Sequence, residues 1–128
     1  MEQPLTVGEF NHFLIHVRDL ERSMAFYRMF GPVEPVPGRN TPVRLGPATQ
    51  LLLHHDPSYK PAAQGNLDHF AIVLEGSPDV QSVVDRVRAH GGEVFDGPRD
   101  DGRGYTQFYV RDPDGNQIEM RIKNAGSA

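Results

Sequence analysis

The fold of this chain can be predicted outward from one stretch, Arg111-Asp112-Pro113-Asp114-Gly115-Asn116-Gln117-Ile118-Glu119-Met120-Arg121. Its first half is typical of a turn, because Pro113 presets φ for the first turn position and Gly115 tolerates a positive φ. Apolar and aromatic residues precede this turn and an alternating segment follows it. The pattern therefore predicts a β-hairpin of strands 105–110 and 117–122.

Apolar and polar residues alternate along the second of these strands. Ile118, Met120 and Ile122 share one face of it, so Glu119 points to the opposite face. An acid there is either a solvated surface group or a functional group. Two other predicted strands present a histidine in a comparable way, which favours a functional group.

Composition limits the classes of protein to consider. With 128 residues, the chain is expected to form one compact domain, residues 1–128, with a substantial core. It contains no cysteine, which excludes disulfides, thiolate nucleophiles and metal sites with cysteine ligands. A formal charge of −4 without a basic block argues against nucleic acid or a membrane surface as the main partner. Residues 1–8 do not resemble a signal peptide and no apolar run is long enough to span a bilayer, so a cytoplasmic location is expected.

The first half of the chain begins with a predicted strand over residues 10–17. Its two faces are Phe13, Ile15 and Val17 on one side and His12, Leu14 and His16 on the other. Asp19 is a suitable N-cap for a helix that runs to about Phe30 and ends at Gly31.

Residues 32–40 contain three prolines and are predicted to form a connector with at most a short edge strand. Two strands, 41–45 and 49–55, are expected to form a hairpin. The polar segment 56–66, which contains proline and glycine, is expected to be a linker.

The pattern then starts again with a predicted strand over residues 67–74. Ser77 is expected to be the N-cap of a second helix, which Gly91 closes. The apolar stripe of this helix comprises Val80, Val83, Val84 and Val87. A short strand is predicted at 93–95, ahead of the final hairpin.

The two halves repeat one unit. Asn11-His12-Phe13-Leu14-Ile15 and Asp68-His69-Phe70-Ala71-Ile72 are visibly alike, and each lies a similar distance before a predicted helix. The order of elements is a strand, a helix and three strands, given twice. An internal repeat of this length predicts two copies of one α+β unit that pack to bury a shared face.

Three segments carry a resemblance to a known family. They are His12 with the residues that follow it to Tyr27, His69 in Asp-His-Phe-Ala-Ile-Val, and Glu119 in Asp-Pro-Asp-Gly-Asn-Gln-Ile-Glu. With them the chain resembles the vicinal oxygen chelate superfamily, which includes glyoxalase I, fosfomycin-resistance enzymes, extradiol dioxygenases, methylmalonyl-CoA epimerase and bleomycin-binding proteins. The resemblance extends from about Phe10 to Lys123.

The resemblance implies an α+β fold of two βαβββ modules whose curled sheets enclose a cavity with a divalent metal. The modules would span about 8–56 and 67–123, with a linker at 57–66. In the family the metal ligands come from the first strand of each module and the last strand of the second. His12, His69 and Glu119 occupy these positions and are the implied ligands. The alternative is that the histidines are structural and satisfied by hydrogen bonds.

Two imidazoles and one carboxylate leave positions on a divalent metal for water or substrate. Such a metal can polarise a carbonyl, stabilise an enediolate, or bring O₂ and a catecholate together on iron. Nitrogen and oxygen ligands suit Fe, Mn, Ni, Co or Zn, and the sequence does not select one of them.

The chain also departs from some relatives. Glyoxalase I and methylmalonyl-CoA epimerase take a fourth ligand from the last strand of the first module, where this chain has leucines at the central positions. Gln50 would reach the metal only with a shifted register, and His54 or His55 only if the strand end curled inward. The basic residues that bind a phosphonate in fosfomycin enzymes are not evident at matching positions, which makes fosfomycin a doubtful substrate.

Two further residues are candidates for catalysis. Tyr109 lies on the strand beside Glu119, and extradiol dioxygenases resemble this arrangement; the alternative is a packed hairpin aromatic. His16 shares the face of His12 and is either an acid–base group or a side chain that fills the cavity mouth. Arg121 shares the face of Glu119 and would either meet an anionic substrate or lie at the surface.

The expected function is that of a metal-dependent lyase, isomerase or dioxygenase acting on a small oxygenated substrate. The competing expectation is a binding protein of the bleomycin-resistance type, without catalysis. The intact ligand set counts against this second function, because those family members generally lack it. A homodimer is expected by analogy with family members.

Overall fold

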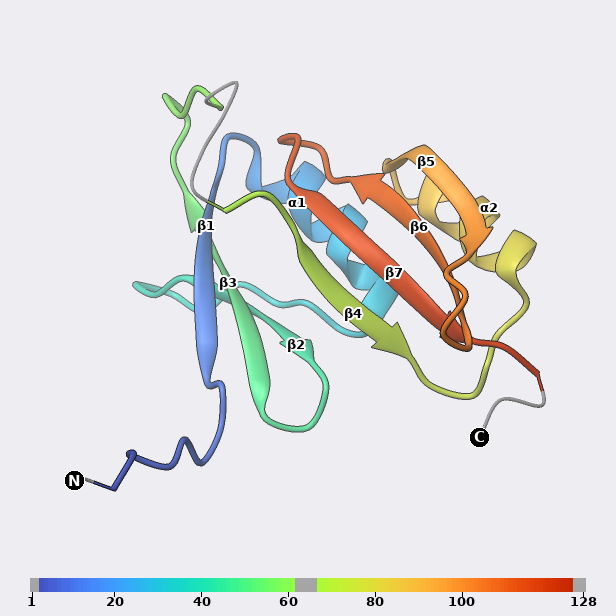
Figure 1. Ribbon diagram of the computed structural model, residues 1–128. Helices are drawn as coiled ribbons and strands as arrows, with labels where there is room; N and C mark the ends of the chain where they lie inside the picture. Colours follow the sequence, from blue (N-terminus) through green and yellow to red (C-terminus); the bar gives the residue numbers. More distant parts are fainter. Residues whose placement is uncertain (1–2, 62–66, 126–128) are drawn as a thin grey trace.

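The structure is a computed structural model that describes residues 3–61 and 67–125, and it contains two β-sheets and two α-helices (Figure 1). In chain order the elements are β1 (His12–Val17), α1 (Leu20–Tyr27), a 3₁₀ turn (Arg28–Phe30), β2 (Thr41–Leu45), β3 (Thr49–His55), β4 (Phe70–Leu74), α2 (Val80–Ala89), β5 (Glu93–Asp100), β6 (Tyr105–Arg111) and β7 (Gln117–Lys123). Part of the predicted linker, 62–66, lies outside the described residues. No helix in the described part of the chain is long and apolar enough to cross a membrane.

Each half of the chain forms its own mixed sheet. The first sheet has the order β1-β3-β2 and the second the order β4-β7-β6-β5. In both, the first strand of the half pairs in parallel with the last strand, β1 with β3 and β4 with β7, while the hairpins are antiparallel. This shared pairing confirms the predicted α+β fold of two related modules.

Two expectations about the modules need correction. All of residues 31–40 are described, and none of them forms a strand, so the first module has two strands after its helix instead of three. Three prolines in this connector remove backbone donors that a strand would need. The sheets also do not close around a cavity: the edge strands β1 and β4 are not hydrogen-bonded to each other, and an open groove of about 550 Å³ is lined by residues of both sheets, including Phe13 and Phe70.

One hydrophobic core joins the modules. Along β1 the side chains that face inward, Ile15 and Val17, are buried, while His12, Leu14 and His16 are exposed, as the alternation predicts. The core takes residues from both sheets and both helices: Ile15, Val17, Met24, Phe26, Tyr27, Val33, Val43, Leu51, Leu53, Val83, Val84, Val87, Phe108, Val110, Ile118, Met120 and Ile122. The two modules therefore bury a shared face.

The start of α1 confirms the prediction and the start of α2 does not. Asp19 caps α1 and accepts a hydrogen bond from the Arg22 amide at 3.1 Å. The cap of α2 is Asp79, whose carboxylate accepts from the Ser82 amide at 3.0 Å, so the assignment of Ser77 was wrong. Ser77 has a φ of 45° and belongs to the turn before the helix.

The strand β5 is longer than predicted, because it continues through Gly97 and Pro98 to Asp100. Proline is tolerated there since β5 is an edge strand of the second sheet, where a missing N–H need not break a ladder. The register shifts twice along the β5–β6 pair. A Cβ at Gly97 would lie 2.9 Å from the Gln107 carbonyl oxygen, which explains glycine at this irregularity.

The turn between β6 and β7 is more than a chain reversal, because both of its aspartates are buried. Asp112 accepts hydrogen bonds from the backbone amides of Asp114 at 2.9 Å and Asn116 at 2.8 Å, which close the turn. Its other oxygen accepts from the Tyr27 hydroxyl of α1 at 2.6 Å. The carboxylate therefore links the last hairpin of the chain to the first helix.

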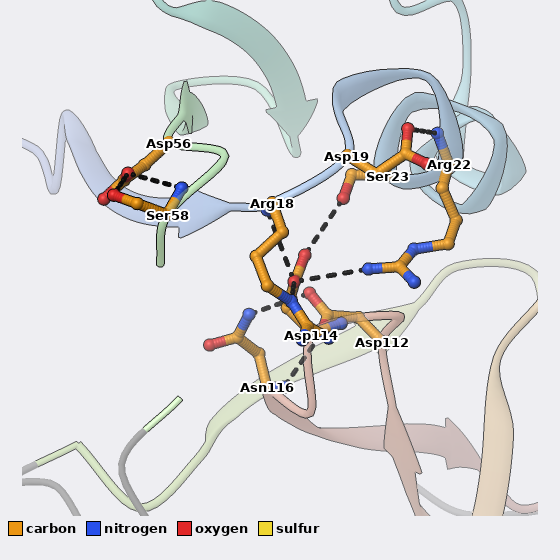
Figure 2. Close-up of polar contacts among 9 residues, drawn as sticks. All are labelled: Arg18, Asp19, Arg22, Ser23, Asp56, Ser58, Asp112, Asp114 and Asn116. Carbon is orange, nitrogen blue, oxygen red and sulfur yellow. Dashed lines mark hydrogen bonds and ion pairs between the residues drawn. The ribbon is translucent and has the colours of Figure 1, made fainter. Parts of the chain in front are cut away.

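Asp114 makes a second set of bonds to the first module (Figure 2). Its side chain is 0% exposed and accepts from Arg18 Nε at 3.0 Å and from Ser23 Oγ at 3.3 Å. Arg22 reaches the same carboxylate at 3.4 Å. These donors lie on or just before α1, so the start of that helix is bound to the β6–β7 turn.

Burial raises the pKa of Asp112, although hydrogen bonds from Tyr27 and Asn116 oppose the shift by favouring the carboxylate. Burial, followed by the nearby Asp112 charge, also raises the pKa of the Tyr27 hydroxyl well above its ordinary value. Tyr27 is therefore a neutral donor at physiological pH.

Replacing Asp114 by alanine is expected to lower the free energy of unfolding by about 3 kcal/mol, because it removes the acceptor of a buried network. This loss is at the low end of the range for a buried ion pair that loses one partner, because Arg18 and Arg22 are half exposed and can be hydrated again. Urea denaturation measures the change. Asp85→Ala, an exposed acid on α2, should change stability by roughly 0.5 kcal/mol or less. Equal effects of the two variants would contradict a structural role for the turn.

Tyr27→Phe is expected to destabilise the protein in a pH-dependent manner. At a pH above the pKa of Asp112, the Tyr27 hydroxyl donates to a carboxylate, and removing this hydrogen bond should lower the free energy of unfolding by about 1.5–3 kcal/mol. At a pH where Asp112 is protonated, the hydrogen bond is between neutral groups, and its removal should lower the free energy of unfolding by only about 1 kcal/mol. The destabilisation should therefore shrink as the pH falls through this pKa. Denaturation at several pH values tests the prediction, with Tyr59→Phe as the control. A constant difference between wild type and Tyr27→Phe would refute it.

Candidate functional site

Three of the predicted site residues meet on the face of the second sheet that points away from the core. The β6–β7 register pairs Tyr109 with Glu119, and the β4–β7 register pairs Ala71 with Glu119. His69 precedes β4 by one residue and lies on the same face as Ala71. Glu119 is only 7% exposed although it points away from the core, because neighbouring side chains cover it.

Each oxygen of the Glu119 carboxylate has a donor or a ring nitrogen beside it. Oε1 accepts from the Tyr109 hydroxyl at 3.0 Å and lies 3.3 Å from His69 Nε2. Oε2 accepts from Arg121 at 2.8 Å. The His69 and Tyr109 rings are in edge contact, with centroids 5.4 Å apart.

A second layer of side chains orients this group. Asp68 Oδ2 lies 2.7 Å from His69 Nδ1, and as a hydrogen-bond acceptor there it orients the ring so that Nε2 faces Glu119. The guanidinium of Arg121 bridges Glu119 and Asp101, which it reaches at 2.8 Å, and it lies over the ring of Tyr105.

The environment favours the ionised form of Glu119. Burial alone would raise the pKa of this carboxyl, but hydrogen bonds from Arg121 and Tyr109, together with the charges of Arg121 and His69, lower it below the ordinary value. Burial and then the hydrogen bond to Glu119 raise the pKa of Tyr109. The site therefore combines a carboxylate with a neutral phenol donor.

Two atoms of this cluster, His69 Nε2 and Glu119 Oε1, have the spacing of neighbouring ligands of a divalent ion. His69 Nε2 faces a carboxylate oxygen 3.3 Å away, and a proton on Nε2 or a cation between the two atoms balances the carboxylate charge. Nitrogen and oxygen ligands at about 2.0–2.2 Å from one metal, in neighbouring positions, lie roughly 2.9–3.4 Å apart. A carboxylate that orients the other ring nitrogen is the usual companion of a metal-bound imidazole.

The third predicted ligand, His12, is not part of this cluster. It lies at the start of β1 in the other sheet, is exposed, and has its Nδ1 2.7 Å from Asn11 Oδ1. In residues 3–61 and 67–125 no group of three or more His, Asp or Glu side chains is arranged to hold a metal ion. The structure thus brings His69 and Glu119 together, without His12.

The remaining candidates also lie in the first sheet. Gln50 is directly opposite His12 in the β1–β3 register, and His54 is opposite His16. His16 contacts Asp56 at 3.1 Å rather than Glu119. The alternation along β3 places His55, which is exposed, on the face opposite to His54.

Sequence reasoning missed the groups that orient the site, Asp68 and Asp101. A signal for Asp68 was present, because each copy of the internal repeat has a side-chain oxygen directly before its histidine, on Asn11 and on Asp68. Asp101 could not be found in this way, since it approaches Arg121 only through the irregular loop that follows β5.

Comparisons with known proteins agree with the fold. The family model described as "Glyoxalase/Bleomycin resistance protein/Dioxygenase superfamily" matches residues 9–120. "Metallothiol transferase FosB" of Lysinibacillus sphaericus (strain C3-41) is 29% identical over 118 residues, which cover 91% of this chain and 83% of that protein.

Solved structures are similar over nearly the whole chain. A glyoxalase/dioxygenase from Nostoc punctiforme superposes with a TM-score of 0.76 at 20% identity, over 96% of this chain and 98% of that one. A glyoxalase/bleomycin resistance protein from Albidiferax ferrireducens T118 has a TM-score of 0.66 at 27% identity, over 88% and 97% of the two chains.

Arg121→Met is expected to raise the pKa of Glu119, because it removes both a hydrogen bond to the carboxylate and a nearby positive charge. A ¹³C NMR titration of the glutamate side-chain carboxyls measures the shift. Arg111→Met is the matched control: Arg111 lies on the adjacent strand, stacks on Phe95 and pairs with Glu93. An unchanged Glu119 titration in Arg121→Met, or an equal shift in both variants, would contradict this account of the site.

Proposed function

We propose that this chain, which belongs to the Glyoxalase/Bleomycin resistance protein/Dioxygenase superfamily, is a metal-dependent enzyme acting on a small substrate with two neighbouring oxygen atoms. His69 and Glu119 would hold a divalent Fe, Mn, Ni, Co or Zn ion. The observation that carries the proposal is the 3.3 Å separation of His69 Nε2 and Glu119 Oε1, with Asp68 behind the imidazole. A bound divalent ion would act as a Lewis acid toward the substrate oxygens.

The third ligand in this proposal is His12 of a second copy of the chain. Two protein ligands hold a catalytic metal poorly, and the described residues of one chain supply no third. His12 is exposed on an edge strand. Its Nδ1 is hydrogen-bonded to the side chain of the preceding residue, Asn11, and His69 Nδ1 is hydrogen-bonded in the same way to Asp68. A homodimer that brings β1 of one copy to β4 of the other would join the two half-sites.

Tyr109 and Arg121 have distinct roles in this proposal. The Tyr109 hydroxyl, which donates to Glu119 in the free protein, would turn to a substrate oxygen once Glu119 binds the metal. Arg121 would hold the second oxygen of Glu119 and offset charge brought by an anionic substrate. Tyr109 is thus the proposed proton donor and Arg121 a positioning residue.

The reaction class we propose is a lyase or isomerase reaction, or a dioxygenation. The similarity to a metallothiol transferase adds the transfer of a thiol to the same kind of substrate. The alternative function is sequestration of a small molecule without catalysis, and it does not require the arrangement of Asp68, His69 and Glu119. That arrangement favours the enzyme.

Metal content tests the proposal. Tag-free protein purified without chelators should contain about one equivalent of transition metal per chain, and His69→Ala should lose nearly all of it. His12→Ala should lose it equally. His90→Gln should not, because His90 contacts the Ala25 carbonyl at the end of α2, away from both half-sites. Iron would indicate oxygen chemistry, and nickel, zinc or manganese a lyase or isomerase.

A mixing experiment tests the second copy. Each mixed dimer of His12→Ala and His69→Ala chains would hold one intact site. Half of the dimers are mixed after random exchange of an equimolar mixture, so metal should return to about one equivalent per four chains. Metal loss in both variants without recovery on mixing would exclude a site shared between copies. Protein that contains no metal and shows no uptake of a divalent ion that depends on His69 would contradict the enzyme proposal and leave the binding function.

A further inference from the structure

We infer that His16 and His54 form a second binding site for a divalent transition ion, separate from the His69–Glu119 pair and independent of the function proposed above. The two histidines lie at the far end of the first sheet from His12, His16 on β1 and His54 on β3. They are directly opposite each other in the parallel register of these strands, so their side chains project from the same face. Both are exposed.

The spacing of the rings fits two ligands of one ion. Their centroids are 4.8 Å apart, with an angle of 57° between the ring planes. An imidazole nitrogen bound at about 2.0–2.1 Å places its ring centroid roughly 3.2 Å from the metal, and two such rings in neighbouring positions have centroids roughly 4.5–5.2 Å apart. The observed separation lies within this range.

Both rings have a side-chain acceptor at Nδ1. His16 Nδ1 lies 3.1 Å from Asp56 Oδ2, and His54 Nδ1 lies 2.9 Å from Asn40 Oδ1. An acceptor at Nδ1 holds the proton there and leaves the lone pair on Nε2, the nitrogen that would bind the ion. Among the described residues neither Nε2 has a hydrogen-bond partner.

The acceptors come from two sides of the pair. Asp56 follows β3 and is tied to the end of β1 by a bond from its amide to the Val17 carbonyl, 2.8 Å long. Asn40 precedes β2, on the other side of β3. The other oxygen of Asp56 accepts hydrogen bonds from the amide and the hydroxyl of Ser58, at 3.2 and 2.8 Å, which hold the side chain in place. The site is therefore built from separate segments that fix both rings.

Two imidazoles and no thiolate suit Zn²⁺, Ni²⁺ or Cu²⁺, and Cu²⁺ should bind most tightly of the three. Asp56 is engaged with His16, so the described residues supply two ligands and water completes the coordination. The ring centroid of Tyr59 lies 5.5 Å from that of His16, so an aromatic side chain would lie beside a bound ion. The coordination positions that water fills are open to an additional ligand from solution.

Isothermal titration with Zn²⁺ tests the site in a His69→Ala/Glu119→Gln background, which removes the other pair. One equivalent should bind, and His16→Gln or His54→Gln should weaken binding at least tenfold. Asp56→Asn should weaken it by about 10–100-fold through the loss of orientation. His55→Gln is the matched control that should not change the affinity, since His55 is the next residue of β3 and its side chain lies on the opposite face of the strand.

A second measurement uses the unmodified protein. Substoichiometric Cu²⁺ should broaden the imidazole NMR signals of His16 and His54 before those of His55 and His90. The inference is overturned if Zn²⁺ binding in the background variant survives both His16→Gln and His54→Gln. It is equally overturned if Cu²⁺ broadens all exposed histidines alike.

Discussion

The structure depends on two buried carboxylates in one turn. Asp112 and Asp114 lie between β6 and β7, where they would be costly to bury without partners. Their partners come from the opposite end of the sequence, on or just before α1: Tyr27 for Asp112, and Arg18, Ser23 and Arg22 for Asp114. No buried side-chain nitrogen or oxygen in the described residues lacks a hydrogen-bond partner. The turn can therefore be buried only when the first helix is in place, which couples the folding of the two modules.

The same turn positions the candidate site. Asp112 closes it by accepting two backbone amides, and this fixes the register in which Arg111 faces Gln117 and Tyr109 faces Glu119. A shift of one residue would turn Glu119 into the core and Ile118 out of it. The bonds between Tyr109, Glu119 and Arg121 thus follow from a constraint located at the other end of the hairpin.

Much of this arrangement could be predicted from sequence, because period-two alternation and turn chemistry are local signals. They identified β2, β3 and the last hairpin, and the internal repeat indicated two modules. The errors occurred where tertiary context decides. Gly97-Pro98 is a local signal to end a strand, yet β5 continues since its outer edge needs no partner. Ser77 is a good cap by composition, but its backbone turns left-handed and Asp79 takes the role. The family resemblance grouped His69 with Glu119, and the parallel pairing of β4 with β7 brings the two together. The position of His12 depends on how two unpaired sheets meet, which no local pattern encodes.

The histidines of the two proposed sites share one electrostatic design, in which an oxygen from a neighbouring residue fixes Nδ1. In each site one histidine has a carboxylate at Nδ1 and the other has an amide. The carboxylates are Asp68 for His69 and Asp56 for His16. The amides are Asn11 for His12 and Asn40 for His54. A carboxylate makes the imidazole a stronger ligand than an amide does, since it stabilises the positive charge that the ring acquires on binding a cation. The two proposed sites therefore differ in the ligand that accompanies the imidazoles. Glu119 supplies a charged oxygen, held by Arg121, and water alone is available beside His16 and His54. On this basis the His69–Glu119 pair suits a resident ion, and the His16–His54 pair suits an ion that exchanges with solution.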